Sequence, residues 1–290
     1  MRTQLDCIPC FTRQALEAAR HVAPGDEALH RRVLDRTCAA IPALPDDASP
    51  PVMGEIIHGI IREETGVDDP YAEVKRENIR RARALVPRLE RFVAECRDRL
   101  EAAVRVAIAG NAIDLGANPD FDLEEEMRRL EGQAADLSDL PSLRRAMDQA
   151  DRVLCIGDNT AEAIFDQFLI RELLPRPVLF AVRSRPIIND ITEAEAREIG
   201  IDRMATIVDS GSPLPGTDLS RATPEFRRLF DETPLVIAKG QGNFETLSDC
   251  GRTVFFLLKV KCPVVARLTG RPEGSPVLVQ GGSRDRVTVA

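Results

Sequence analysis

Acidic and amide side chains that directly follow short apolar runs have the composition of a metal site. Asp158-Asn159 comes after Val153 to Gly157, and Asn189-Asp190 lies beyond Pro177 to Val182. Carboxylate and amide oxygens are ligands that Mg²⁺ and Mn²⁺ prefer, whereas zinc prefers histidine and cysteine. The three histidines lie in the first 60 residues, far along the chain from these pairs. We therefore expect one divalent metal ion that is bound by oxygen ligands from these loops.

Each of these polar residues has a simpler explanation as a helix cap, because Asp, Asn and Ser side chains accept hydrogen bonds from the free N–H groups at a helix start. For a single Asp-Asn pair, capping is the better explanation. It does not explain why polar residues follow so many apolar runs. The segments are Gly110 to Asp114, Asp158 to Glu162, Arg183 to Pro186, Asn189-Asp190, Asp209 to Ser212 and Lys239 to Asn243.

Lys239 and the glycines beyond it suit a phosphate group. The lysine supplies a positive charge, and Gly240 and Gly242 expose backbone N–H groups. Gly-x-Gly alone is weak evidence, since it also occurs in ordinary tight turns, but the nearby carboxylates strengthen it. The further candidates for contact with a substrate are Asn243, Arg183, Ser210, Gly211, Asn111 and Asp114.

Glu162 lies four residues after Asp158, so both side chains can face one pocket. There Glu162 would act as a general base or hold a substrate hydroxyl. The alternative is a glutamate in the first turn of a helix, which the helix dipole favours. Both interpretations stay open for Glu162, whereas Thr192 and Glu195 form a capping box, which is a structural feature.

Taken in order, these segments resemble the metal-dependent damage-control phosphatases, a family also called acidic-residue-methyltransferase-like. Cys7-Ile8-Pro9-Cys10 resembles the prokaryotic group of that family, and the likeness spans nearly the whole chain. The resemblance implies a helical N-terminal part, a Rossmann-like part and one divalent ion, Mn, Mg, Co or Ni. It implies that Asp158, Asn159 and Asp190 hold this ion, and that Lys239 contacts the phosphate. Ala161 stands where many relatives have glycine, so the substrates of these relatives cannot be assigned directly to this protein.

The predicted reaction is hydrolysis of a small phosphate ester, with catalytic roles for Asp158, Glu162 and Lys239. We favour attack by water over direct attack by Asp158, which would form an aspartyl phosphate. One rival is an S-adenosylmethionine-dependent carboxyl methyltransferase, but only Gly110-Asn111 follows the first expected strand, where such enzymes have a glycine-rich loop. The other rival is a non-catalytic binder of a phosphorylated metabolite.

The elements that must position these residues fall into two parts. Residues 1–103 read as a helical domain, in which Asp6 caps a helix through Leu16, Asp69-Pro70 starts another, and Pro87 breaks or kinks it. Residues 104–290 read as an α/β metal- and phosphate-binding domain, Rossmann-like and three-layered, with a mostly parallel sheet. Its expected strands are Val104 to Ala109, Val153 to Gly157, Pro177 to Val182, Ala205 to Val208, Leu235 to Ala238, Val264 to Leu268 and Val277 to Val279.

Composition narrows the possible partners. The formal charge of −8, without any run of Lys or Arg, argues against nucleic acid and anionic membranes, so we expect a small phosphorylated metabolite. No apolar stretch approaches the about 20 residues that span a bilayer, and the start lacks the apolar core of a signal peptide, which predicts a cytoplasmic protein. The seven cysteines are widely scattered, which favours free thiols. Cys7 and Cys10 read as packed thiols or an auxiliary metal site, and the oligomeric state stays open.

Overall fold

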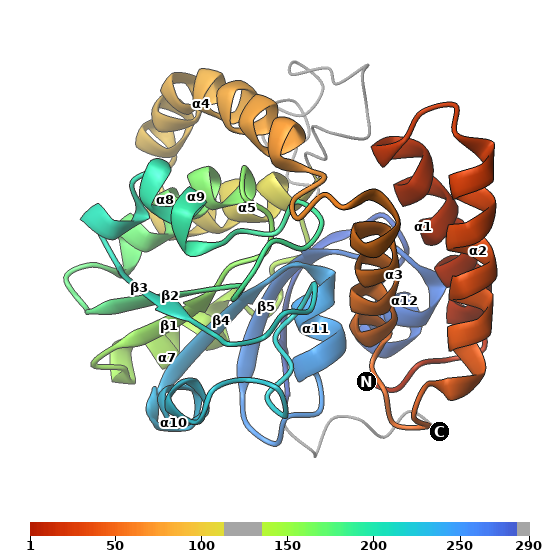
Figure 1. The fold of residues 1–290 in the computed structure, drawn as a ribbon. Coiled ribbons are helices and arrows are strands. Elements are labelled where there is room, and N and C mark those ends of the chain that lie inside the picture. Colours follow the sequence, from red (N-terminus) through yellow and green to blue (C-terminus); the bar gives the residue numbers. More distant parts are fainter. Residues whose placement is uncertain (113–134, 283–290) are drawn as a thin grey trace.

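A mostly parallel sheet forms the centre of the protein (Figure 1). The structure, a computed structural model, describes residues 1–112 and 135–282, and within these ranges the sheet has six strands in the order β3-β2-β1-β4-β5-β6. Only β6 is antiparallel to its neighbour. The α/β class with a mostly parallel sheet is thereby confirmed. The strands are β1 (Val153–Ile156), β2 (Val178–Val182), β3 (Thr206–Asp209), β4 (Leu235–Lys239), β5 (Val254–Lys259) and β6 (Pro276–Gly281).

Successive strand residues face opposite sides of the sheet and pack into two different layers. In β1, Val153 and Cys155 join the apolar cluster that includes α4 (Ala72–Glu95) and α5 (Arg99–Ala112), whereas Leu154 and Ile156 join the cluster on the other face. The first layer also contains α7 (Leu140–Gln149), α8 (Glu162–Leu173) and α9 (Glu193–Glu198), with a 3-10 turn at Ile201–Arg203. The second layer contains α10 (Pro224–Glu232) and α11 (Gly240–Leu247).

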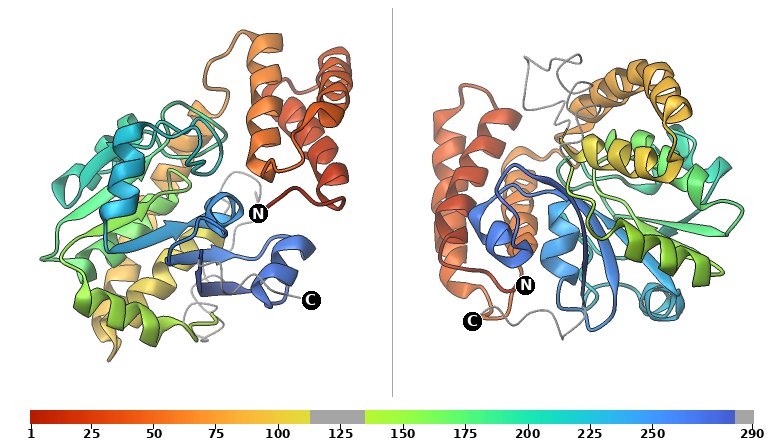
Figure 2. Two further views of the ribbon diagram at one scale, coloured as in Figure 1. Left: turned by 90° about the horizontal axis from the view of Figure 1, so that it is seen from below. Right: turned by 180° about the vertical axis from the view of Figure 1, so that it is seen from behind.

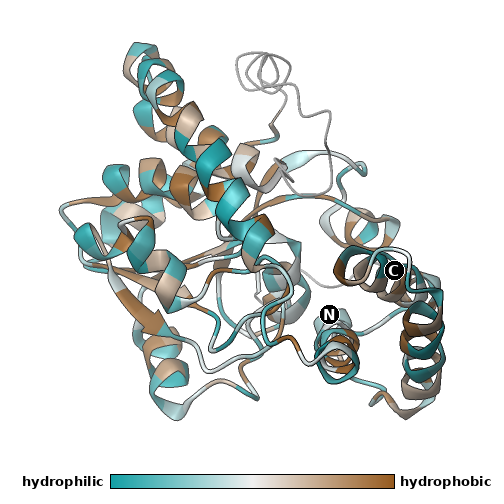
Figure 3. Cartoon of the chain, turned by 45° about the horizontal axis from the view of Figure 1, so that its top comes forward, coloured by the Kyte–Doolittle hydropathy of each residue, from teal (hydrophilic) through white to brown (hydrophobic). Residues whose placement is uncertain are grey.

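Three N-terminal helices stand beside the sheet (Figure 2). They are α1 (Cys7–Val22), α2 (Glu27–Ala40) and α3 (Pro50–Thr65), with a 3-10 turn at Ile41–Ala43 between the last two. Their own apolar cluster includes Phe11 and Met53, and it extends to Val264 of α12 (Pro263–Thr269). Helix α3 also contacts α11, which places this part next to the second layer. Figure 3 shows apolar and polar faces on most helices, as expected where one face packs inward.

Two predicted strands are wrong. The run Val104 to Ala109 lies inside α5, whose residues are buried on nearly every side, so the run shows no helical periodicity. Its alanines favour a helix. The run Val264 to Leu268 lies inside α12, where Pro263 occupies the first turn and Cys262 accepts a hydrogen bond from the Val265 N–H. The structure instead adds β5, which the prediction missed.

The boundary predicted between residues 103 and 104 falls inside α5. Helix α5 packs against α8 and β5, and α4 also packs against α8. Helices α4 and α5 therefore share a core with the sheet, and the division into two domains stays a prediction.

The predicted helix ends are partly confirmed. Asp6 precedes α1 but makes no side-chain cap; it pairs instead with Arg267 at 2.6 Å. Asp69 accepts a hydrogen bond from the Tyr71 N–H at 3.1 Å just before α4, and α4 continues through Pro87 without a break. The Thr192–Glu195 capping box is present. In residues 1–112 and 135–282, no helix has the length and apolar character that crossing a bilayer requires.

Candidate active site

The candidate site lies where β1, β2 and β4, three neighbouring parallel strands, reach their carboxyl ends. Doubly wound sheets bind ligands in this position, because the connections on the two sides of β1 diverge there. Asp158 follows β1, Arg183 follows β2, and Lys239 is the last residue of β4. The strand ends thus bring together residues separated by up to 81 positions in the sequence.

The loop after β2 folds back over the segment after β1. The Ile191 N–H donates to the carbonyl of Asp158 at 2.9 Å, and the Thr160 N–H donates to the carbonyl of Asn189 at 2.8 Å. Asn159 and Asp190 form an isolated β-bridge between these hydrogen bonds. The three residues predicted to bind a metal ion are therefore brought together by backbone pairing.

Arg183 joins the two acidic residues of this set. Its Nε donates to Oδ2 of Asp190 at 2.7 Å, and its Nη2 lies 3.8 Å from Oδ1 of Asp158. Nη1 donates to Thr217 at 2.9 Å, so the guanidinium is held from two sides. Arg183 is 2% exposed, and it was predicted to bind substrate. Its observed partners show an additional structural role, which is to fix the positions of Asp158 and Asp190.

The turn before Asp190 is strained. Ile188 has a φ of 47°, a left-handed conformation that is costly for a β-branched residue. The Asp190 N–H closes this turn by donating to the Ile187 carbonyl at 3.0 Å. Such strain persists only where surrounding contacts enforce it, and it concentrates at functional sites.

A second set of contacts holds the same loop from the N-terminal side. Lys75 of α4 is 2% exposed, and its Nζ lies 2.6 Å from Oε1 of Glu195 and 2.7 Å from Oδ2 of Asp69. The other carboxylate oxygen of Glu195 accepts from the Thr192 N–H at 3.0 Å. The capping box is therefore also a link between α4 and the loop that carries Asp190.

Lys239 points away from solvent, into the layer formed by α5 and α8. Leu235 and Ile237 face that layer, and Lys239 faces it too because every second side chain of a strand lies on the same side of the sheet. Its Nζ lies 2.5 Å from Glu162 and 2.5 Å from Asp166, and it donates to the Ala107 carbonyl at 2.8 Å. Burial lowers the pKa of Lys239, but the charges of Asp166 and Glu162 outweigh it and raise that pKa above its ordinary value. Lys239 is thus a charged lysine within an ion-pair cluster.

Sequence reasoning missed Asp166. It lies one helical turn after Glu162 on the buried face of α8, and it is 3% exposed. Burial raises the pKa of Asp166 to about 7, against the opposing charge of Lys239. The available signal was the spacing of the two acids, since positions four apart share one face of a helix. Thr217, which binds Arg183, carried no such signal.

The buried cluster has more negative than positive charge. Four carboxylates, Asp158, Glu162, Asp166 and Asp190, and two cations, Arg183 and Lys239, are each at most 8% exposed. When all are ionised, the formal charge is −2. Burial and the nearby carboxylates of Glu162 and Asp190 raise the pKa of Asp158 well above its ordinary value, and burial raises that of Asp190 against the effect of Arg183.

Asn159 lies among these carboxylates. Its Nδ2 is 3.4 Å from Oδ2 of Asp158 and 3.3 Å from Oε2 of Glu162. In the described ranges, no three His, Cys, Asp or Glu side chains are arranged to hold a metal ion, and the predicted set has two acids and one amide.

The start of α11 approaches Asp158 closely. Gly240 has a φ of 76°, and a Cβ at this position would lie 1.8 Å from Oδ2 of Asp158. A Cβ at Gly242 would lie 2.1 Å from the Pro215 carbonyl oxygen. Only glycine fits either position, so the Gly-x-Gly pattern has a packing reason besides the predicted phosphate contact.

The other predicted substrate residues have structural partners. The amide of Asn243 donates to the carbonyls of Gly157 at 3.0 Å and Lys239 at 2.7 Å, which ties α11 to β1 and β4. Ser210 is fully buried and donates to the Val182 carbonyl at 2.7 Å. Gly211 has a φ of 72° and packs against the backbone of Thr223. Substrate contact by these residues stays a prediction.

Two predicted residues are not placed at a strand end. The backbone of Asn111 belongs to α5, because the strand expected before it is a helix; its side chain and all of Asp114 lie outside the described residues. The first strand is β1, and Gly157-Asp158-Asn159 follows it. A glycine-rich loop of the methyltransferase type is absent there too.

The fold and the site define an α/β protein with a buried acidic cluster at the carboxyl ends of its central strands. A family model described as the damage-control phosphatase ARMT1-like domain matches residues 3–277. This chain therefore belongs to that phosphatase family, as the resemblance of its motifs predicted.

The relatives match along most of their length. The damage-control phosphatase PH1575 of Pyrococcus horikoshii is 32% identical over 287 residues, which cover 97% of this chain and 98% of the relative. A damage-control phosphatase of Archaeoglobus fulgidus is 34% identical over 229 residues, covering 76% of this chain and 79% of the relative. The crystal structure of PH1575, titled a DUF89 family protein, matches with a TM-score of 0.87 at 30% identity, covering 97% of this chain and 99% of that one.

Proposed function

We propose that this protein is a divalent-metal-dependent phosphatase that hydrolyses a small phosphate ester in metabolite repair. Membership of the damage-control phosphatase family supports the reaction class. The observation that carries the metal dependence is the formal charge of −2 in the buried cluster of Asp158, Glu162, Asp166, Asp190, Arg183 and Lys239. Burying uncompensated charge is costly, and a divalent cation would offset it.

The donor set fits such an ion. Asp158 and Asp190 supply carboxylate oxygens, and Asn159 supplies an amide oxygen once its side chain turns to present Oδ1 instead of Nδ2. These three residues would hold Mn, Mg, Co or Ni. When bound, the ion would neutralise phosphate charge and make a water molecule more acidic.

The protein's own groups have separate roles in this proposal. Arg183 holds Asp158 and Asp190 in position, and Lys239 pairs with Glu162 and Asp166, which offsets part of the negative charge of the cluster. Glu162 is the candidate general base, because its Oε2 lies 3.3 Å from the Asn159 amide and thus borders the metal ligands. Water is the preferred nucleophile, and attack by Asp158 is the alternative.

The first turn of α11 supplies the phosphate contacts. Lys239 precedes this helix and makes no side-chain cap to its backbone N–H groups. N–H groups at a helix start attract anions. In this arrangement the backbone N–H groups of Gly240 and Gly242 bind the phosphate. Lys239 does not contact the phosphate and acts through its positive charge from the layer formed by α5 and α8.

Release of inorganic phosphate from p-nitrophenyl phosphate tests the proposal. The purified protein is treated with chelator and then assayed with Mn²⁺, Mg²⁺, Co²⁺ and Ni²⁺ separately, beside Asp158→Asn. We expect turnover with at least one ion and loss of turnover in the variant. Binding of the ester without turnover under all conditions would favour a non-catalytic binder.

A further inference from the structure

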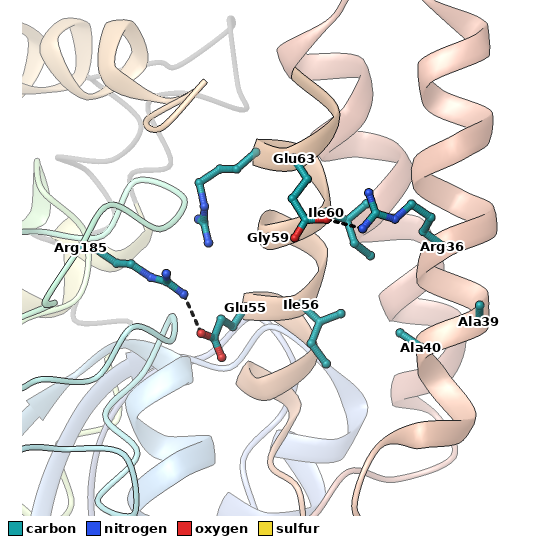
Figure 4. A pocket seen from close by; sticks show the side chains of 10 residues that line it. Arg36, Ala39, Ala40, Glu55, Ile56, Gly59, Ile60, Glu63 and Arg185 are labelled. Carbon is teal, nitrogen blue, oxygen red and sulfur yellow. Dashed lines mark hydrogen bonds and ion pairs between the residues drawn. The ribbon is translucent and has the colours of Figure 1, made fainter. Parts of the chain in front are cut away.

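A cavity of about 740 Å³ lies between the N-terminal helices and the loop after β2 (Figure 4). Its charged lining comes from Arg36 of α2, from Glu55, Arg62 and Glu63 of α3, and from Arg185. In Figure 4, Arg185 reaches across from the α/β side to Glu55. The volume is in the range of small-molecule sites, about 300–1,000 Å³.

Most of these charges are paired with one another. Glu55 accepts from Arg185 at 2.7 Å and also pairs with Arg221. Arg221 additionally lies 4.0 Å from Asp218. Arg36 pairs with Glu63, and with Glu64 at 2.9 Å.

Arg62 is different. In the described part of the chain no hydrogen bond or ion pair of its guanidinium is found. Burial lowers the pKa of Arg62, and the charge of nearby Arg185 lowers it further. Its Nη2 lies 4.0 Å from the position of a Cβ on Gly59, which also lines the cavity. The carboxylates of Glu55, Asp68 and Glu63 are near enough to act on its charge, but among the described residues none of them pairs with it directly.

The cavity and the candidate active site share the loop after β2. Arg185 is two residues beyond Arg183, so their Cα atoms are separated by at most about 7 Å. Ile56 and Ile60 add apolar surface to the lining. A ligand with an anionic group and a less polar body matches this combination.

We propose that this cavity is a second anion site, in which Arg62 and Arg185 bind a phosphate group carried by a small organic molecule. Two guanidinium groups from opposite walls suit the several oxygens of a phosphate, which accept paired hydrogen bonds from arginine. The phosphate belongs either to a second position of the substrate or to a separate ligand. In both cases binding depends most on Arg62, because within the described ranges its guanidinium has no direct ion pair to give up, whereas Arg185 pairs with Glu55.

Calorimetric titration with glucose 1,6-bisphosphate in excess chelator tests the site by itself. Without metal, the acidic cluster repels anions, so heat of binding reports the arginine cavity. We expect saturable binding to the wild type, weaker by about tenfold in Arg62→Gln. Arg31→Gln is the matched control, since Arg31 is an exposed α2 arginine paired with Asp35 outside the cavity. Absence of binding, or equal binding in wild type and Arg62→Gln, would overturn the proposal.

Kinetics with metal then identifies the source of the phosphate. If it belongs to the substrate, Arg62→Gln lowers kcat/KM for the bisphosphate by about tenfold and leaves p-nitrophenyl phosphate unaffected. If it belongs to a separate ligand, the bisphosphate alters p-nitrophenyl phosphate turnover non-competitively in the wild type but not in Arg62→Gln. Thermal unfolding confirms that the variant is folded. If neither ester is hydrolysed, the proposed function fails, whereas the titration in chelator still decides the anion site.

Discussion

Nζ of Lys239 lies 2.5 Å from Oδ1 of Asp166, on the side of β4 that α8 covers. The second carboxylate at the same distance is Glu162. This lysine therefore has two roles: it stabilises the fold, and it contributes positive charge to the acidic cluster of the site. A substitution at this position has to be measured in both respects.

We predict that Lys239→Met lowers kcat on the order of a hundredfold, because the acidic cluster of the site loses one of its two cations. It should also lower the free energy of unfolding by roughly 3–5 kcal/mol, since Glu162 and Asp166 lose their common cation. Lys239→Arg should rescue little, because a planar guanidinium does not fit the place of a compact ammonium. Steady-state kinetics and urea unfolding measure the two effects, and a kcat within about threefold of wild type would make the lysine catalytically irrelevant.

Removal of the metal ion should abolish hydrolysis. Asp158→Asn and Asp190→Asn should each weaken metal binding by at least about tenfold, because each removes an anionic ligand from a buried site. Both variants should stay folded, since they also relieve repulsion among buried carboxylates. Calorimetric metal titration is the measurement, and wild-type affinity in either variant would exclude that residue as a ligand.

Gly240→Ala should disrupt the site through one methyl group. The new Cβ would lie 1.8 Å from Oδ2 of Asp158, so the carboxylate has to move. We expect kcat/KM to fall on the order of a hundredfold, as misplaced catalytic groups typically cause.

The matched control is Gly274→Ala. Gly274 has a φ of 87°, and a Cβ there meets nothing within 4 Å. This variant therefore has the backbone strain, roughly 1–2 kcal/mol, without the clash. Equal activity losses in the two variants would show that strain, and not the contact with Asp158, is responsible.

His58 should make the N-terminal helices sensitive to acid. Burial, together with the charge of Arg62 and the proximity of His21, lowers the pKa of His58 to about 4. In the unfolded chain this histidine has its ordinary pKa of about 6.5. Between pH 4 and pH 6.5 the unfolded state therefore binds more protons than the folded state, so the free energy of unfolding falls as pH decreases from 6.5 to 4. The full loss is on the order of 3 kcal/mol.

Urea unfolding from pH 7 to pH 4 checks this effect. The control is His58→Phe, which keeps a ring in contact with Tyr71, a neighbour of His58 at 5.6 Å between ring centroids. The unfolding free energy of the wild type minus that of the variant should increase as pH rises from 4 to 6.5 and then level off. A difference that does not change with pH would mean that His58 does not titrate with folding.

Cys7→Ser/Cys10→Ser should keep most of the phosphatase activity. Both thiols are free, and Cys7 packs with Phe11 and Met53 in the N-terminal apolar cluster and not in the acidic cluster. Phosphate release with saturating metal is the measurement. A folded but inactive double variant would assign these thiols a function beyond packing.

The sequence alone was sufficient to predict the strands β1, β2 and β4 and the polar residues after them. Apolar runs of four to five buried residues followed by Asp, Arg or Lys are local signals, and parallel strands place their carboxyl ends at one edge of the sheet. The metal set of Asp158, Asn159 and Asp190 was an implication of the family resemblance, and the structure brings these three residues together. The family also followed, because its motifs are contiguous segments.

Only the tertiary structure decided what each short apolar run becomes. Val104 to Ala109 and Val264 to Leu268 are helical, because complete burial removes the polar and apolar alternation that distinguishes a strand from a helix. Tertiary packing also decided the partners of the charged residues. Lys239 binds Asp166 because it lies an even number of residues after Leu235, which turns both side chains toward the layer of α8. Arg185 pairs with Glu55 because α3 and the loop after β2 line the same cavity. Such pairings join residues far apart in sequence, and no local pattern encodes them.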